Sequence, residues 1–328
     1  MRRLNILIWH IHGSYLNALA RIEHNWYLPT KPGKPEGYGG RGPTFDLPDY
    51  VREVAAEDVR DLDLDLDLDL DLIIYQTPKN YFQDGPEILS ERQRALPSVY
   101  LEHNTPRPDA VQTRHPVAER DILLAHVTHY NRLMWDNGPA PTVVIEHSVA
   151  IAPDARYTGR LERGVTVVNG PEKRPRIAGL DIYQRAARVV PLDIAGMETE
   201  ALGGLGDIPY RDLHRRIADY RFLFSPMRYT SLPLAVVEAM TLGMPVVALA
   251  TTELPAVIED GVTGYISCDV ERLIGDMRRL IAHPEEARRM GARARAVARE
   301  RFGLARFARD WNAAFARAMD LRPAVPIS

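Results

Sequence analysis

The sequence predicts two doubly wound α/β domains, each built on a parallel β-sheet. The chain has 328 residues, which is more than a single hydrophobic core usually serves, so two domains are expected. Short apolar runs alternate with helical stretches along the first half, and a second series of the same kind begins near Gly164. This alternation is typical of parallel sheets covered by helices.

The first series supplies an N-terminal domain. Short apolar runs bounded by turn residues predict strands at 4–11, 26–28, 71–76, 99–102, 125–128 and 143–145. Helices are expected at 15–22 and 86–95. Residues 29–48 hold many Gly and Pro residues, which predicts a loop that could act as a lid or contact an acceptor.

The second series supplies a C-terminal domain. Strands are expected at 165–168, 192–196, 222–224 and 246–249, and helices at 182–187, 210–220, 234–242, 271–282, 284–301 and 304–321. In the last helix Phe307, Trp311, Phe315 and Met319 repeat every four residues. This stripe predicts packing into a core.

Composition narrows the functional class. The net charge of −3 gives no reason to expect a nucleic-acid partner, and the lone Cys268 fits a reducing compartment. The first apolar run is too short for a signal peptide and is interrupted by His10 and His12. Since no apolar run reaches membrane-spanning length, we expect a cytoplasmic protein with at most peripheral membrane contact.

Residues 61–72 are Asp-Leu repeated six times. As a strand, this repeat would place six carboxylates on one face, which suggests a weak cation site. Six like charges on one face repel one another, however, and Asp disfavours strands. We interpret the repeat as a low-complexity segment ahead of the strand at 72–75, without a catalytic role.

The region 222–266 carries the clearest functional pattern. Pro233 favours the start of a helix, which leaves the backbone N–H groups of Leu234 and Ala235 available at its N-terminus. Such a terminus suits a phosphate. Glu238, one turn further in, suits a sugar hydroxyl. The region therefore predicts a nucleotide-sugar site.

The motifs of this region resemble the donor-binding domain of family 4 (group 1) retaining glycosyltransferases. The resemblance is carried by Ser225-Pro226, Glu238-Ala239-Met240, Gly243-x-Pro245-Val246-Val247-Ala248 and Glu259-Asp260-Gly261-x-x-Gly264. It implies the GT-B fold, in which two Rossmann-like domains face a central cleft. We place the acceptor-side domain at 1–151, the donor domain at 152–304, and at 305–328 a helix that crosses back to the N-terminal domain.

The resemblance also implies roles for individual residues. His103 and Glu238 are the candidate catalytic residues, and Glu238 should also hold the nucleoside ribose. The other candidate donor-binding residues are Gly13, Lys173, Arg174, Arg176, Thr230, Ser231, Leu234 and Ala235. No cofactor and no obligatory metal are expected, because cationic side chains and helix termini would stabilise the leaving diphosphate.

One position departs from the family pattern and keeps a second function open. Thr230 stands where the family has a first glutamate, and Ser231-Leu232-Pro233 replaces its glycine run. The first hypothesis is transfer of a sugar from a nucleotide-diphosphate donor to a saccharide or lipid-linked acceptor, with polysaccharide assembly as the family-level expectation. The alternative is a catalytically inactive relative that binds a nucleotide or glycan. A nucleotide-sugar epimerase is a third possibility.

Overall fold

The structure is a computed structural model that describes residues 2–63 and 69–321. The chain divides into two compact units. Unit 1 comprises Met1–Ser148 and Leu304–Ser328, and unit 2 comprises Val149–Gly303. The final helix therefore belongs to the same unit as the first half of the chain. Each unit carries one parallel sheet, which confirms the predicted fold class of two parallel-sheet α/β domains.

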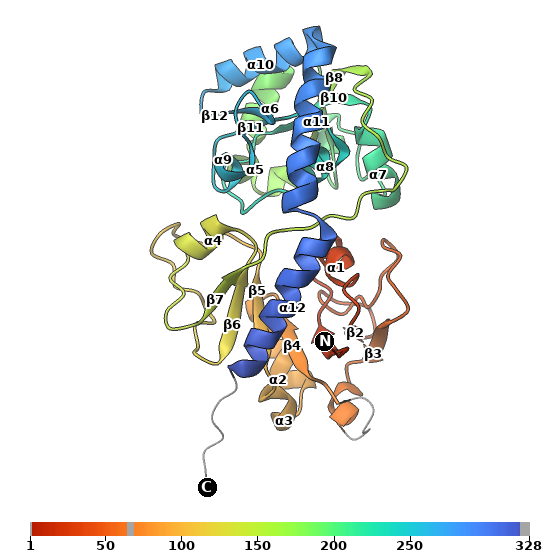
Figure 1. Cartoon of the computed structure of the whole chain (residues 1–328), viewed down its shortest axis with the longest axis vertical. Helices are drawn as coiled ribbons and strands as arrows, with labels where there is room; N and C mark the ends of the chain where they lie inside the picture. Colours follow the sequence, from red (N-terminus) through yellow and green to blue (C-terminus); the bar gives the residue numbers. More distant parts are fainter. Residues whose placement is uncertain (1, 64–68, 322–328) are drawn as a thin grey trace. The chain divides into compact units, whose positions relative to one another are not determined.

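Unit 1 is built on a seven-stranded sheet in the order β3-β2-β1-β4-β5-β6-β7 (Figure 1). Its strands are β1 (Asn5–Ile8), β2 (Asn25–Thr30), β3 (Val51–Ala55), β4 (Leu72–Tyr75), β5 (Ser98–Glu102), β6 (Ile122–His126) and β7 (Thr142–Val144). All neighbouring pairs are parallel. The helices are α1 (Gly13–Leu19), α2 (Gly85–Ile88), α3 (Glu91–Arg94), α4 (His129–Met134) and α12 (Leu304–Asp320), with short turns η1 (Val59–Asp63) and η2 (Asn80–Asp84).

Alternating strand residues divide the core of unit 1 between two faces, because successive side chains of a strand point in opposite directions. Ile6 and Ile8 pack with α1 and with the aromatic stripe of α12. Leu7 and Trp9 pack on the other face with residues of α2. Figure 1 shows α12 lying across β5 and β6.

Unit 2 is built on a five-stranded parallel sheet in the order β12-β11-β10-β8-β9. Its strands are β8 (Leu161–Val167), β9 (Leu192–Ala195), β10 (Tyr220–Ser225), β11 (Val246–Leu249) and β12 (Gly264–Ser267). The helices are α5 (Pro175–Ala178), α6 (Leu180–Ala187), α7 (Tyr210–Ile217), α8 (Leu234–Leu242), α9 (Leu254–Val257), α10 (Val270–Ala282) and α11 (Pro284–Arg301), with turns η3 (Pro171–Lys173) and η4 (Glu200–Leu202).

The two faces of this second sheet are also covered by helices. Leu223 packs with buried residues of α8 and α11. Phe222 and Phe224 pack with residues of α6 and α10. The helix α8 is therefore buried between the sheet and α11, which explains why it is apolar almost all round.

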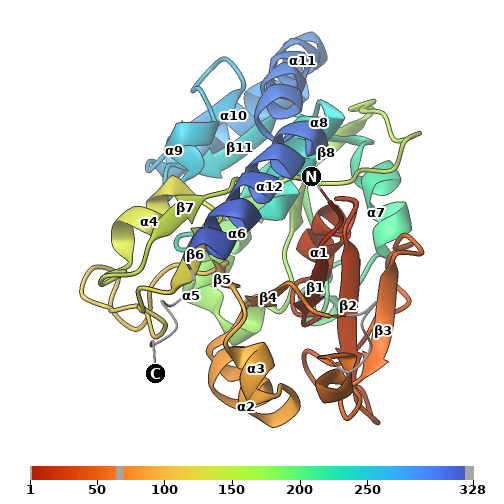
Figure 2. The ribbon, with the colours of Figure 1, turned by 60° about the horizontal axis from the view of Figure 1, so that its bottom comes forward.

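Several elements differ from the sequence prediction, among them two strands, the short helices α4, α5 and α9, and one break within a helix. The edge strand β3, which lies beside β2 in Figure 2, and the strand β12 were not predicted. The predicted helix 86–95 is wrong, because it divides into α2 and α3. Leu89 is extended at the break, and Ser90 caps α3 through reciprocal hydrogen bonds with Gln93.

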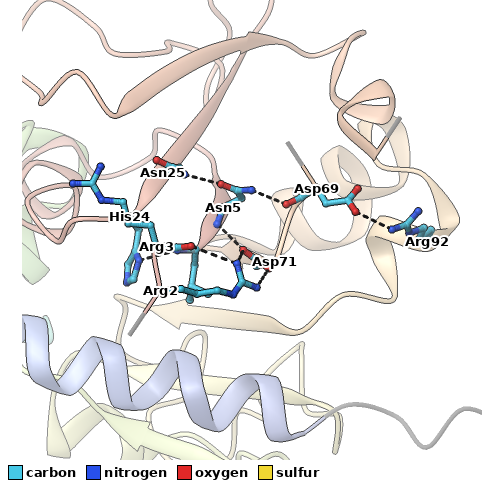
Figure 3. Close-up of polar contacts among 9 residues, drawn as sticks. Arg2, Arg3, Asn5, His24, Asn25, Asp69, Asp71 and Arg92 are labelled. Atoms are coloured by element: carbon cyan, nitrogen blue, oxygen red, sulfur yellow. Dashed lines mark hydrogen bonds and ion pairs between the residues drawn. The ribbon is translucent and has the colours of Figure 1, made fainter. Parts of the chain in front are cut away.

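The described end of the Asp-Leu repeat anchors the start of the chain (Figure 3). An Asp71 carboxylate oxygen accepts a hydrogen bond from the Asn5 backbone N–H at 2.8 Å, and the carboxylate also pairs with Arg2. The Asn5 side chain donates to the Asp69 carbonyl at 2.8 Å. These contacts give Asp71 a structural role at the amino edge of the sheet. Residues 64–68 of the repeat lie outside the described residues.

Candidate functional site

Gly13 begins α1, directly after the first strand and its short turn. A Cβ atom added there would lie 2.6 Å from the Phe45 ring, so only glycine fits this contact. Phe45 belongs to the predicted loop at 29–48. In the same loop, the Gly40 carbonyl accepts a hydrogen bond from His10 Nδ1 at 2.6 Å. The loop therefore packs over the turn where we predicted that a ligand approaches Gly13.

Three histidines gather at the carboxyl edge of the unit 1 sheet. His12 follows β1, and His103 directly follows β5, as the sequence predicts. Their ring centroids lie 4.0 Å apart. The Tyr15 ring contacts His103 edge-on at 4.8 Å and His147 at 5.7 Å. We call His12, His103 and His147 the histidine cluster.

The members of the histidine cluster are neutral at pH 7. Burial lowers the pKa of His12 from 6.5 to about 4. Burial, assisted by the neighbouring His12 and His147, lowers the pKa of His103 well below 6.5. Burial, Arg306 and His12 together lower the pKa of His147 to about 3. Each ring disfavours its charged form because the surroundings offer little solvation.

The side chain of Gln76 orients His103. The Gln76 amide donates to the Trp9 carbonyl at 2.6 Å, which turns its oxygen toward His103 Nε2 at 3.1 Å. His103 therefore donates from Nε2, and Nδ1 carries the lone pair. The two ring nitrogens of His147, in contrast, are buried without a hydrogen-bond partner among the described residues. A neutral imidazole held in one tautomer can accept a proton or orient a hydroxyl.

In unit 2, the N-terminus of α8 presents unpaired backbone donors. Pro233 precedes the helix in an extended conformation and provides no side-chain cap. The first backbone N–H of this turn that donates within the described residues is that of Val236, which bonds to the Pro233 carbonyl at 3.0 Å. Leu234 and Ala235 are half-buried, and their N–H groups have no acceptor among the described residues. This arrangement suits an anion.

Glu238 lies on α8 and is buried, with its carboxylate held from α7. Tyr210 donates its hydroxyl to Glu238 Oε1 at 3.0 Å. His214 Nδ1 accepts from the Ala152 backbone N–H at 3.3 Å, so its Nε2–H faces the same Oε1 from 3.5 Å, without a hydrogen bond. The carboxylate is therefore oriented before any ligand binds.

Thr230 and Ser231 lie in the turn between β10 and α8. Thr230 is half-buried and Ser231 is buried. Thr252, after β11, donates its hydroxyl to the Ser231 carbonyl at 3.3 Å. Thr251 similarly donates to the Met227 carbonyl at 3.0 Å. The two threonines tie the β10–α8 turn in place beside the open N-terminus of α8.

The three residues of the predicted basic run, Lys173, Arg174 and Arg176, are exposed. Lys173 pairs with Glu198 at 2.5 Å, and Arg176 lies 3.5 Å from Asp181. Arg228 makes a two-pronged contact with the same Asp181 carboxylate. The run follows β8 as predicted, and two of its cations are already engaged by carboxylates.

None of the helices in the described part of the chain has both the length and the apolar character needed to cross a membrane. Residues 2–63 and 69–321 contain no group of three or more His, Cys, Asp or Glu side chains arranged to hold a metal ion.

The architecture is that of GT-B glycosyltransferases, and one family model matches part of the chain. Residues 200–297 match the family described as "Glycosyl transferases group 1". This segment includes α7, α8 and most of α11, and therefore Tyr210, His214 and Glu238. No curated protein matches the chain.

Solved structures support the same fold. Sucrose-phosphate synthase from Thermosynechococcus elongatus is similar over 97% of this chain and 100% of its own, with a TM-score of 0.71 and 16% identity. Anabaena HepE in complex with UDP is similar over 97% of this chain and 100% of its own, with a TM-score of 0.69 and 16% identity. A variant of S. aureus TarM in complex with UDP and saccharides covers 74% of this chain and 55% of its own, with a TM-score of 0.57 and 16% identity.

Sequence reasoning missed the residues that hold the candidate groups. Tyr210 and His214 approach Glu238 from 28 and 24 positions away, and no local pattern connects them. Sequence reasoning also did not select His147, although it follows a strand as His12 and His103 do. The shared position after a strand is the signal that could have found it.

Proposed function

We propose that this chain is a retaining glycosyltransferase that moves a sugar from a uridine diphosphate donor to a saccharide or lipid-linked acceptor. The observation that carries the proposal is the open N-terminus of α8 with the oriented Glu238 one turn further in, inside the segment that matches the family model. Support for uridine comes from HepE, which was solved with UDP and with UDP-glucose.

The proposed reaction breaks the bond between the anomeric carbon and the bridging oxygen of the donor diphosphate, which keeps the electron pair, and forms a bond from that carbon to the acceptor oxygen. The acceptor proton leaves with the diphosphate. In unit 2, the N–H groups of Leu234 and Ala235 stabilise the growing phosphate charge. Lys173, Arg174 and Arg176 supply positive charge to the same diphosphate, in keeping with the family resemblance.

The remaining candidate residues orient the sugars. Glu238 accepts hydrogen bonds from the ribose hydroxyls, and it is suited to this because Tyr210 holds the carboxylate. Thr230 and Ser231 offer hydroxyls toward the donor sugar. In unit 1, His103 remains the candidate catalytic residue, a neutral imidazole that can accept a proton or orient a hydroxyl, and Gly13 remains the candidate for close approach of a ligand to the backbone.

We propose that no cofactor or obligatory metal takes part, since backbone donors and cationic side chains provide the charge that a metal would otherwise supply. The proposal includes a cytoplasmic location and a role in polysaccharide assembly. Activity measured with and without EDTA tests the metal independence. A loss of activity that Mg²⁺ or Mn²⁺ restores would contradict it.

The experiment that tests the function is incubation with UDP-, GDP- and ADP-sugars, with and without a panel of saccharide and lipid-linked acceptors. We expect release of UDP, and a product whose anomeric configuration by NMR matches that of the donor. Failure of all donors to bind or hydrolyse would contradict the proposal. Conversion of the donor sugar without acceptor would instead indicate an epimerase.

A specific observation favours the alternative of an inactive nucleotide- or glycan-binding protein. Thr230 replaces a carboxylate, and Lys173 and Arg176 are engaged by Glu198 and Asp181 rather than open to a ligand. Under this alternative UDP binds, no sugar is transferred, and Thr230→Glu does not raise the rate. Transfer by the unaltered chain would exclude it.

A further inference from the structure

A cavity in unit 2 is lined by arginines. It measures about 350 Å³, and the arginines that line it are Arg156, Arg288, Arg295 and Arg299. Tyr157 and Gly243 form part of its wall, and no lining residue is acidic. We call this cavity the arginine pocket. It lies entirely within unit 2, since all its lining residues fall between Val149 and Gly303.

The arginine pocket lies far from the proposed nucleotide site along α8. The nucleotide site is at Leu234, where the helix begins after β10, whereas Gly243 follows the last residue of the helix. Nine residues of helix separate the two points by about 13 Å. Tyr157 also precedes β8, which places the pocket at the amino edge of the sheet. Figure 1 shows α11, which carries three of the arginines, alongside α8.

Two of the arginines lack internal partners. Arg156 donates to the carbonyls of Pro153 and Ala155, and Arg288 pairs with Glu285. Neither Arg295 nor Arg299 makes a side-chain hydrogen bond or ion pair within the described residues. The Nε atom of Arg295 is buried and unpaired. Burying such a donor without an acceptor is unfavourable, because its interaction with water is lost and not replaced.

The neighbouring charges are also mutually unfavourable. Burial lowers the pKa of Arg295, and the positive charges of Arg299 and Arg156 lower it further. Like charges this close repel unless an anion lies between them. The protein tolerates this repulsion in a pocket that has no acidic lining.

Capping of α8 does not account for the arginines. A helix C-terminus attracts cations because its last carbonyls are unpaired. Here the Gly243 N–H donates to the Met240 carbonyl at 3.0 Å, and the Met244 N–H donates to the Ala239 carbonyl at 2.9 Å. These bonds form a Schellman-type cap that pairs the Ala239 and Met240 carbonyls, and among the described residues no arginine of the pocket donates to a carbonyl of α8.

We propose that the arginine pocket binds a phosphate monoester, either a small organic phosphate or the headgroup of a phospholipid. Guanidinium groups match phosphate oxygens in two-pronged geometry, and several of them favour a dianion over a carboxylate. The volume is at the small end of ligand pockets and suits one phosphorylated group of a few carbons. This site is separate from the proposed sugar transfer and does not depend on it.

The test compares two double variants of α11 that lose the same charge. Arg295→Gln with Arg299→Gln removes the two unpaired arginines of the pocket. Arg289→Gln with Arg293→Gln removes two exposed arginines of the same helix that do not line it. Binding of inorganic phosphate and of glycerol phosphate is measured by calorimetry, with glycerol as the neutral control.

We expect both phosphates to bind the unaltered chain, and binding to weaken roughly 10- to 100-fold in the pocket variant only. UDP affinity should be unchanged in that variant, which separates this site from the nucleotide site. Equal weakening in both variants would overturn the proposal, because it would indicate diffuse charge. Absence of binding to the unaltered chain, with loss of thermal stability in the pocket variant, would assign the arginines a structural role instead.

A second arm distinguishes the two sources of phosphate. Phosphatidylcholine vesicles with and without phosphatidic acid are sedimented with each variant. Binding of the soluble phosphates without vesicle binding identifies a free ligand, and vesicle binding that only the pocket variant loses identifies a lipid headgroup. Either result supports the pocket. If neither the soluble phosphates nor the vesicles bind the unaltered chain, the proposal fails.

Discussion

The two units hold their candidate chemical groups by opposite means. In unit 1, the histidine cluster is held mainly by burial and ring contacts. His103 alone has a recognised orienting hydrogen bond, to Gln76, and the two ring nitrogens of His147 have no hydrogen-bond partner among the described residues. In unit 2, the Glu238 carboxylate is held by a hydroxyl of α7 at hydrogen-bonding distance. The surroundings of the histidine cluster disfavour the charged imidazolium form, whereas the hydrogen bond from Tyr210 orients the Glu238 carboxylate. The first should therefore respond to protons, and the second to the loss of one hydrogen bond.

The largest expected effect is a loss of stability of unit 1 in acid. The pKa values of the three clustered histidines lie below 6.5 in the folded chain, so the unfolded chain binds more protons below that pH. Stability is complete above pH 6.5 and falls as the pH drops toward 4. Each histidine costs on the order of 2 kcal/mol by about pH 4.5.

Tryptophan fluorescence measures this effect selectively, because all four tryptophans lie in unit 1: Trp9, Trp26, Trp135 and Trp311. Urea unfolding is followed at pH 7.5 and at pH 4.5. His147→Phe should flatten the pH dependence, since it keeps an aromatic ring and removes one titrating group. His129→Gln, at an exposed position, is the control. Equal pH dependence in both variants would show that the cluster does not control acid stability.

A smaller effect is expected at the oriented carboxylate. Glu238→Ala should weaken UDP binding about 10- to 100-fold, because it removes a charged partner of the ribose hydroxyls worth about 1.5–3 kcal/mol. Calorimetric titration with UDP measures this change, and thermal unfolding followed by circular dichroism checks the fold. Glu162→Ala, at an exposed glutamate of β8, should bind UDP normally. Unchanged binding in Glu238→Ala would remove Glu238 from the nucleotide site.

Tyr210→Phe isolates the orienting hydrogen bond from the carboxylate itself. Tyr210 acts as a positioning residue, so its loss should cost about 1 kcal/mol of UDP binding, roughly fivefold. A double-mutant cycle with Glu238→Ala supplies the decisive measurement. We expect the effect of Tyr210→Phe to vanish when Glu238 is absent. Additive effects would mean that Tyr210 acts by another route.

Elements whose ends carry a local signal were predicted well. The bounds of α8, β11 and α11 agree with the prediction, because Pro233, Gly243, Pro245 and Pro284 mark them. The strand β3 contains Arg52 and Glu53 and lies at the sheet edge, so it lacks the apolar run of a central strand. The break between α2 and α3 did carry a signal, since Ser90 and Gln93 have capping-box spacing.

The candidate site was predictable only in part. A residue that directly follows a strand can be placed at the carboxyl edge of a parallel sheet, and this located His103. The contact of Tyr210 with Glu238 depends on how α7 packs beside α8, which no local pattern encodes. The arginine pocket likewise joins Arg156 to residues of α11 more than a hundred positions away. Residues that only tertiary packing brings together can be identified only from the structure.

The smallest expected effect concerns Lys173, which is neither buried like the histidine cluster nor oriented by a buried hydrogen bond like Glu238. Its ammonium pairs with Glu198 in an exposed contact, and such pairs contribute about 0–1 kcal/mol. Glu198→Gln should therefore leave thermal stability nearly unchanged. It should strengthen UDP binding about two- to threefold at low salt, because Lys173 no longer has a competing carboxylate, and the gain should disappear at high salt.

The matched control for Glu198→Gln is Glu271→Gln, which removes an exposed carboxylate that pairs with Arg185 in the same unit. If both variants strengthen UDP binding equally, the gain reflects net charge alone. If Glu198→Gln weakens binding, Glu198 holds Lys173 in its binding position, much as Tyr210 holds Glu238. A gain confined to Glu198→Gln would instead identify Lys173 as a diphosphate ligand that the carboxylate restrains. The exposed basic run that contains Lys173 would then bind the diphosphate through long-range charge attraction, whereas Glu238 binds the ribose through a carboxylate that Tyr210 already orients.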